Sequence, residues 1–256
     1  EVINKKNIFI FIFFILYFKI LDEIYYMTDN LEEFYQLLQL HKDFPLDELK
    51  DHYFVPARAT LNSNPNIVQK ILNDKTALTM VVEQLLMPRI NSIREIELNL
   101  LAMDIVEKCP KEVLNYQDVD GNSVIHLSTR RECFSVGVLD LIYNNGGSFS
   151  LVNKKGETPL IQIATNNSLD DVKFIHAYTL PEMLDWQDNK GNTALMHAIK
   201  QYKLNNIFFF LSVGSNLHKV NKNGFTPLEF IMNPAYVESC EPQVYRELLK
   251  VISKHC

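Results

Sequence analysis

One short pattern recurs at a fixed spacing in this chain and constrains its fold more than any other feature. The clearest copy reads Asn153-Lys-Lys-Gly-Glu-Thr-Pro-Leu160. In every copy Asp or Asn is followed three residues later by Gly, and Ser or Thr comes two residues after the Gly. The four glycines are Gly121, Gly156, Gly191 and Gly224, which lie 35, 35 and 33 residues apart. A period of this size is typical of a solenoid, whose repeats bury their apolar faces only by stacking.

The pattern also has the local chemistry of a tight turn that leads into a helix. A short Asp or Asn side chain can accept hydrogen bonds from the backbone of its own turn, and Gly adopts positive φ at little cost. Ser or Thr then caps a helix, and Pro suits the first helical position because its missing N–H would have no partner there. The sequence therefore predicts a hairpin-like turn and a helix at the start of each unit.

Apolar segments downstream of these turns predict a second helix in three of the units. They span residues 136–143, 169–177 and 204–211. Gly146 and Gly214 follow the first and the last of them, where a glycine in the left-handed conformation commonly ends a helix. Each unit is thus expected to be a helix-turn-helix.

On these residues the chain resembles the ankyrin repeat family, whose unit of about 33 residues contains the pattern Thr-Pro-Leu-His-x-Ala. The second and fourth units keep it best, with Thr158-Pro-Leu160 and Thr226-Pro-Leu228. His126 holds the family's histidine position in the first unit, whereas His197 lies one position late in the third. The resemblance implies an all-α helical solenoid of helix-turn-helix units joined by β-hairpin turns, with helical caps at both ends.

The rest of the chain is assigned around these units. Thr76-Ala-Leu78 resembles a repeat start without its glycine, and a helix is expected at about 93–108. Leu31, Phe34, Leu37 and Leu38 have helical spacing. The expected segments are an N-terminal helical cap at 27–72, repeats at 73–233 that are degenerate over 73–117 and clear over 118–233, and a C-terminal capping helix within 234–256.

Residues 1–26 differ from the rest of the chain. Lys5 and Lys6 precede an apolar run at 8–18, which is shorter than the roughly 20 residues of a spanning helix. A secretory signal fits the basic start and the apolar run, but no small-residue cleavage site follows. We expect this segment to lie outside the native product, with translation starting at Met27. Secretion or anchoring through residues 8–21, and an ordinary core helix, are the alternatives.

Charge and cysteine content narrow the class of protein. The net charge of −6 and the pI of about 5.7 argue against a general nucleic-acid binder, which is usually strongly basic. The four cysteines lie far apart and form no Cys-x-x-Cys pair, so the sequence predicts neither a zinc cluster nor a disulfide framework. We interpret the four cysteines as reduced thiols, which are typical of an intracellular protein. We expect the protein to be a cytoplasmic monomer.

The sequence contains no motif of a reaction centre. Gly-x-Ser-x-Gly, His-Glu-x-x-His and the glycine-rich phosphate loops are absent, and Gly146-Gly-Ser-Phe-Ser150 lacks the last glycine of the first of these. The resemblance implies a structural role for His126, through a local hydrogen bond near the turn. We therefore expect no catalytic residue, no metal site and no cofactor.

The resemblance implies instead a protein-binding surface on the concave face, beside the turn glycines and after the inner helices. The matching positions that favour partner binding are Arg130, Arg131, Lys154, Lys155, Lys190, Lys200, Gln201, Lys222 and Phe225. Basic residues prevail there although the chain is acidic, so an acidic partner segment is expected; the alternative is that these lysines only solvate exposed turns. Trp186 is a second candidate anchor, unless it packs on a neighbouring unit.

The function expected from these features is that of a non-catalytic adaptor that binds another protein, by analogy with the fold. The alternative is the targeting part of a host-directed effector, or of an enzyme with an unrecognised N-terminal activity.

Overall fold

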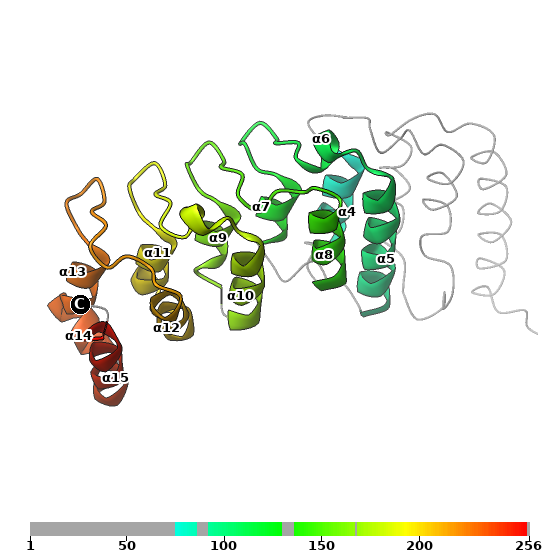
Figure 1. Cartoon of the computed structure of the whole chain (residues 1–256). Coiled ribbons are helices and arrows are strands. Elements are labelled where there is room, and N and C mark those ends of the chain that lie inside the picture. Colours follow the sequence, from blue (N-terminus) through cyan, green and yellow to red (C-terminus); the bar gives the residue numbers. More distant parts are fainter. Residues whose placement is uncertain (1–74, 86–91, 130–135, 167, 255–256) are drawn as a thin grey trace, which may run out of the picture. The chain divides into compact units, whose positions relative to one another are not determined.

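The computed structural model describes 75–85, 92–129, 136–166 and 168–254 of the chain (Figure 1). The expected cap at 27–72, the leader at 1–26 and the candidate site residues Arg130 and Arg131 lie outside these ranges.

The chain divides into two compact units, Glu1–Val113 and Leu114–Cys256. In the first unit α4 (Ala77–Leu85) packs against α5 (Ser92–Lys108). Thr76 and Thr79 cap the start of α4 reciprocally. The Thr76 hydroxyl accepts from the Thr79 N–H at 3.2 Å, and the Thr79 hydroxyl accepts from the Thr76 N–H at 2.8 Å. This helix pair therefore begins at a threonine, as three of the four clear repeats do, although it has no turn glycine. A single helical turn, α6 (Lys111–Leu114), follows.

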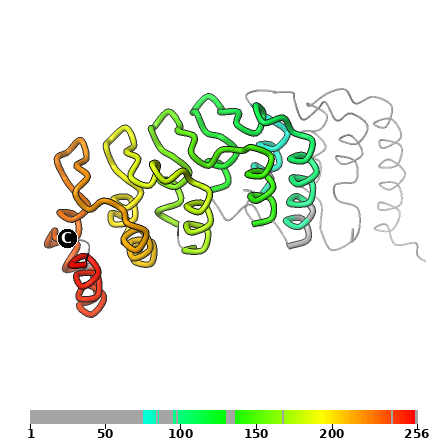
Figure 2. Tube along the Cα trace, viewed as in Figure 1, coloured from blue at the N-terminus to red at the C-terminus, as the bar shows by residue number. Residues whose placement is uncertain are grey.

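The second unit is a series of helix pairs, and the hairpins that join them project to the same side (Figures 1 and 2). Each inner helix packs against the next one along the chain, and α10 packs against α12. The inner helices are α7 (Val124–Ser128), α9 (Pro159–Ile163), α11 (Ala194–Lys200) and α13 (Pro227–Met232). The outer helices are α8 (Val136–Asn144), α10 (Leu169–Tyr178) and α12 (Leu204–Ser212). The predicted all-α solenoid is confirmed.

The inner helices begin where the sequence predicts. The hydroxyls of Thr158, Thr193 and Thr226 accept from the backbone N–H three residues later, at 3.2, 3.3 and 3.2 Å. Pro159 and Pro227 occupy the first helical position of α9 and α13. These caps satisfy donors at the helix start that have no partner within the helix.

Glycines end two of the outer helices as expected. Gly146 and Gly214 both have φ of 88°. After α12 the Gly214 N–H bonds the Leu211 carbonyl at 3.1 Å and the Ser215 N–H bonds the Phe210 carbonyl at 3.0 Å, which is the Schellman pattern. The unit without this glycine continues into a short 3-10 helix, η3 (Pro181–Met183).

The C-terminal segment holds two helices, α14 (Pro234–Ser239) and α15 (Pro242–Ile252). The sequence predicts a single capping helix in this segment. Asn233 ends α13 and also caps α14, since its Oδ1 accepts from the Ala235 N–H at 2.9 Å. An Asn-Pro pair therefore serves here as both a stop and a start. Among the described residues, no helix combines the length and the apolar character needed to cross a membrane.

The Asp or Asn side chain at the start of each hairpin stabilises the turn through hydrogen bonds. Oδ1 of Asp188 accepts from the N–H groups of Lys190 and Asn192, both at 2.8 Å. The same pair of bonds is formed by Asp118, Asn153 and Asn221 in their own hairpins. The turn glycines at 121, 156, 191 and 224 have φ of 78°, 77°, 77° and 83°. The Asx side chain and the glycine thus define one repeated turn geometry.

Backbone hydrogen bonds then join each hairpin to the next. The N–H of Lys154 donates to the Asp120 carbonyl at 2.9 Å, that of Asn189 to Lys155 at 2.9 Å, and that of Lys222 to Lys190 at 3.0 Å. We call these three bonds the hairpin ladder. The close approach requires glycine, because a Cβ built at Gly191 would lie 2.6 Å from the backbone nitrogen of Lys222. The corresponding Cβ at Gly224 meets nothing within 4 Å.

This contrast predicts unequal effects of the same substitution at two turns. Both Gly224→Ala and Gly191→Ala place Ala at positive φ, which costs about 1 kcal/mol. Gly191→Ala must also push the fourth hairpin away from the third, so we expect it to lower the free energy of unfolding by at least about 1 kcal/mol more. Denaturant unfolding of both variants measures the difference. Equal destabilisation would show that the ladder does not form.

Candidate partner-binding surface

The hairpin ladder brings four of the predicted binding residues into one row. Lys154, Lys155, Lys190 and Lys222 are exposed on successive hairpins, and the ladder bonds involve the backbone of each of them. We call these four residues the lysine row. Among the exposed charged residues of the four hairpins, Asp120 is the acidic one. The row is therefore a positively charged strip on an acidic chain.

The other predicted residues lie beside this row. Lys200 ends α11, Gln201 follows it, and both are exposed. Phe225 directly follows the turn glycine of the fourth hairpin, and 47% of its surface is exposed. Arg130 and Arg131 fall outside the described residues, so their place in the surface stays a prediction.

Lys200 is held by two neighbours. Its Nζ donates to Oδ1 of Asn192 at 2.7 Å and lies 4.7 Å from the ring centroid of Phe230. Partial burial lowers the pKa of this lysine, the attraction of Asp188 opposes that effect, and the repulsion of Lys190 adds to it. The Phe230 ring packs in turn on Phe225, with centroids 5.5 Å apart and planes 31° apart. The ammonium group and two aromatic rings thus form one cluster.

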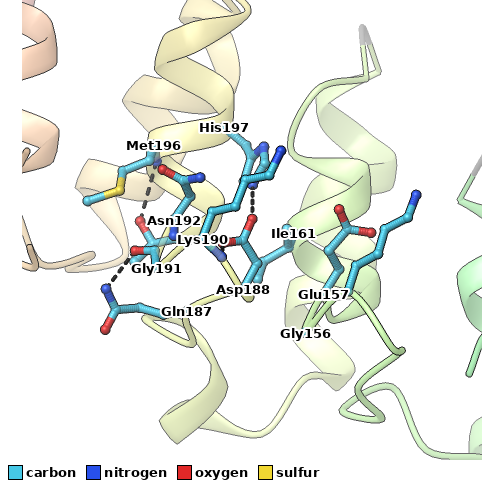
Figure 3. Close-up of polar contacts among 12 residues, drawn as sticks. Gly156, Glu157, Ile161, Gln187, Asp188, Lys190, Gly191, Asn192, Met196 and His197 are labelled. Atoms are coloured by element: carbon cyan, nitrogen blue, oxygen red, sulfur yellow. Dashed lines mark hydrogen bonds and ion pairs between the residues drawn. The ribbon is translucent and has the colours of Figure 1, made fainter. Parts of the chain in front are cut away.

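The histidines of the repeats have structural partners. Nδ1 of His126 accepts from the Ser123 N–H at 3.1 Å, so its Nε2 carries the proton and donates to the Glu157 carbonyl at 3.0 Å. This residue is fully buried and links its unit to the next. His197, one position late, instead contacts Oδ2 of Asp188 through Nε2 at 2.8 Å (Figure 3). The position of His197, one residue later in its unit, therefore allows it to pair with the buried carboxylate of Asp188.

Side-chain amides connect the hairpins beneath the lysine row. Nδ2 of Asn153 donates to Oδ1 of Asn122 at 3.1 Å, and Nδ2 of Asn221 donates to Oδ1 of Asn192 at 2.9 Å. Between these two links the same positions hold Glu157 and Asp188, which cannot donate to each other when ionised. Glu157 accepts from Asn153 at 3.2 Å, and Asp188 has His197. These Asn, Glu and Asp side chains beneath the lysine row thus form hydrogen bonds within the protein.

Trp186 proves to be part of this framework. Its indole N–H donates to the carbonyl of Gly156 in the preceding hairpin at 2.9 Å, and 40% of the residue is exposed. The contact with the neighbouring unit agrees with the packing interpretation and leaves part of the ring in solvent.

The sequence reasoning missed two glutamines that link the hairpins. Nε2 of Gln187 donates to the carbonyls of Gly191, at 2.6 Å, and Val220, at 2.8 Å. Gln117 bonds the carbonyls of Gly121 and Val152 in the same manner. The signal was present, because an aromatic residue, Gln and Asp occur in this order before both turns.

The described residues contain no group of three or more His, Cys, Asp or Glu side chains that could hold a metal ion. Burial raises the pKa of the Cys109 thiol to about 12 and also raises that of Cys240. Neither thiol is therefore activated as a nucleophile at neutral pH.

Comparison with known proteins agrees with this architecture. Residues 125–221 match the family model of ankyrin repeats, in three copies. The chain is 31% identical over 112 residues to the ankyrin repeat protein FPV024 of Fowlpox virus (strain NVSL), a match that covers 43% of this chain and 18% of the viral protein. It is 28% identical over 131 residues to an intracellular phospholipase A2 of Caenorhabditis elegans, covering 49% and 12%. The chain thus matches less than a fifth of the length of either relative.

Repeats of this type are protein-interaction modules, built from stacked hairpins and helix pairs. On the repeat pattern, the helix-pair stack and the family match, residues 125–221 are similar to ankyrin repeats.

The Asp188–His197 contact predicts a specific dependence of stability on pH. Burial would raise the pKa of Asp188, but hydrogen bonds from His197 and from the backbone of Asn192 and Lys190 outweigh it and hold the pKa below its ordinary value. A lowered carboxylate pKa contributes stability above the unfolded value, and this stability is lost as the pH falls through the folded value. Asp188→Asn keeps the turn acceptor, as in Asn153 and Asn221, but does not titrate.

We therefore expect the melting temperature of the wild type to fall more than that of Asp188→Asn between pH 5 and pH 3. Thermal melts monitored by circular dichroism measure this. Asp170→Asn, which alters an exposed carboxylate on α10, is the control and should keep the wild-type slope. Parallel acid curves for Asp188→Asn and the wild type would contradict the prediction.

Proposed function

We propose that this chain is a non-catalytic interaction module whose lysine row binds an acidic segment of a partner protein. The observation that carries the proposal is the hairpin ladder, which fixes four exposed lysines on neighbouring hairpins. Complementary charge speeds association and selects partners more than it adds affinity. The lysines are fixed through their backbone, so a partner meets a strip of charge at defined spacing.

Two further features support a binding role over catalysis. The His, Asp, Glu and Asn side chains next to the row already bond one another or the backbone. The surface next to the lysines also offers the ring of Phe225, and interfaces are enriched in aromatic residues. The similarity to a phospholipase covers 12% of that enzyme and carries no activity over to this chain.

We further propose that the protein works in the cytoplasm as a monomer. The four cysteines lie far apart in the sequence and form no Cys-x-x-Cys pair, which suits a reducing compartment. The overall charge of −6 disfavours nucleic acid as the partner, because like charges repel.

The test compares two matched charge reversals in the full chain. One changes Lys154, Lys190 and Lys222 to Glu, and the control changes Lys173, Lys250 and Lys254, which are exposed on α10, on α15 and just after α15. Both alter the net charge by the same amount. Proteins recovered by affinity purification are quantified by mass spectrometry, and a protein that passes this comparison is then purified for binding assays.

We expect such a partner to bind the wild type and the control but to lose about tenfold or more in association rate with the row reversal. Raising the salt concentration should weaken wild-type binding in the same direction. The melting temperature should change little in both variants, because the side chains are exposed. A partner set unaffected by the row reversal would reject the lysine row as the binding surface.

A further inference from the structure

The residue after the turn glycine has a different environment in the last hairpin. In the first and third hairpins this position is Asn122 and Asn192, which are 4% and 3% exposed and bond the amide of the following hairpin. In the fourth hairpin it is Phe225. The residues that follow fold into α13, α14 and α15 instead of another hairpin, and 47% of the surface of Phe225 is exposed.

Phe225 belongs to a cluster of three side chains beside the lysine row. Its ring packs on Phe230 of α13, and Lys200 of α11 places its ammonium group over the Phe230 ring. We call these three residues the aromatic–lysine site. They come from the fourth hairpin, from α13 and from the end of α11, and therefore combine side chains of two repeats.

The ammonium group of Lys200 is positioned by contacts within the chain itself. One of its three N–H donors bonds Oδ1 of Asn192, which is itself bonded by Asn221 of the next hairpin. A lysine that is already ordered loses less side-chain entropy on pairing with a ligand. Two donors remain for a carboxylate beside the aromatic rings.

We propose that the aromatic–lysine site anchors one large apolar side chain of the partner segment, with a neighbouring carboxylate of that segment bound by Lys200. This inference rests on the proposed function and specifies the ligand of the same surface. The apolar side chain covers the exposed Phe225 ring, and the lysine row receives the acidic residues that precede or follow it. The partner motif is thus an aromatic or large aliphatic residue inside an acidic stretch.

The charges at the site select this ligand over a cationic one. Aromatic faces attract ammonium and guanidinium groups, but Lys200 already lies against Phe230. Lys222 is on the same hairpin as Phe225, and Lys190 is on the preceding one. A lysine or arginine side chain would meet like charge there. Buried aromatic contacts at the centre of an interface supply most of its energy, while surrounding charges set the approach.

Three dye-labelled peptides of equal length test the site in a fluorescence anisotropy titration with the full chain. The first has a Phe at the centre of an acidic stretch of Glu and Ser, the second has Ser in place of the Phe, and the third has Gln in place of every Glu. We expect the first peptide to bind at least about tenfold more tightly than each of the others. Equal binding of the first two, or binding of none, would overturn the anchor.

Variants of the chain separate the two contacts. Phe225→Ser should reduce binding of the first peptide to the level of the Phe-free peptide. Lys200→Gln keeps a donor for Asn192 but loses the charge, so binding should fall, and Lys200→Arg should restore it. Val136→Ser, a change at an exposed apolar residue of α8, is the matched control and should have no effect. Unchanged binding by Phe225→Ser would reject the proposal.

The two proposals fail in different ways. If the row reversal abolishes peptide binding while Phe225→Ser and the Phe-free peptide behave as wild type, the lysine row stands and the anchor is wrong. If the row reversal has no effect but Phe225→Ser does, the anchor stands and the lysine row is wrong. Loss in both variants supports both.

Discussion

The hydrogen bonds between successive hairpins are the constraint on which the second unit of this protein depends. Each Asx side chain closes its own turn, the glycine removes the Cβ that would block the neighbour, and a single backbone N–H then bonds the preceding hairpin. The local turn and the contact between repeats thus depend on the same Asx and Gly residues, except Gly224, beside which nothing lies within 4 Å. The ladder fixes the hairpins in one row, and the exposed side chains between its bonds become a continuous surface.

The side-chain links between hairpins differ from one pair of repeats to the next. Where two amides meet, Asn donates to Asn, as between hairpins one and two and between three and four. Where Glu157 and Asp188 occupy those positions, the amide link is lost. Gln162 and Asn153 then bond the glutamate, and His197 bonds the aspartate. Glu157, Asp188 and His197 therefore have hydrogen-bond partners within the repeats, and these contacts account for their positions without a reaction centre.

Much of this architecture could be predicted from the sequence, because turns and caps depend on local chemistry. The Thr caps, the helix-ending Gly214 and the outer helices near 136–143, 169–177 and 204–211 follow from residue types and spacing, and the structure confirms them. Helix α14 is not predicted, because the residue before a proline commonly ends a helix, whereas Asn233-Pro234 here also starts one. His197 bonds Asp188 in the turn of its own repeat. Gln117 and Gln187 each bond their own turn and the next repeat. Such contacts depend on the folded geometry of the turns and of their stacking, which periodicity alone does not supply. For the same reason the exposure of Phe225 beside Lys200 emerged only from the structure.

The backbone bonds between hairpins hold this surface together, and amide hydrogen exchange measured by NMR tests their role most directly. The N–H groups of Lys154, Asn189 and Lys222 belong to residues with exposed side chains, and each donates to the preceding hairpin. We predict that all three exchange much more slowly than unstructured amides, at least about a hundredfold, because exchange requires two hairpins to separate. Exchange of these three amides at the unprotected rate, in a chain whose inner helices stay protected, would contradict the account.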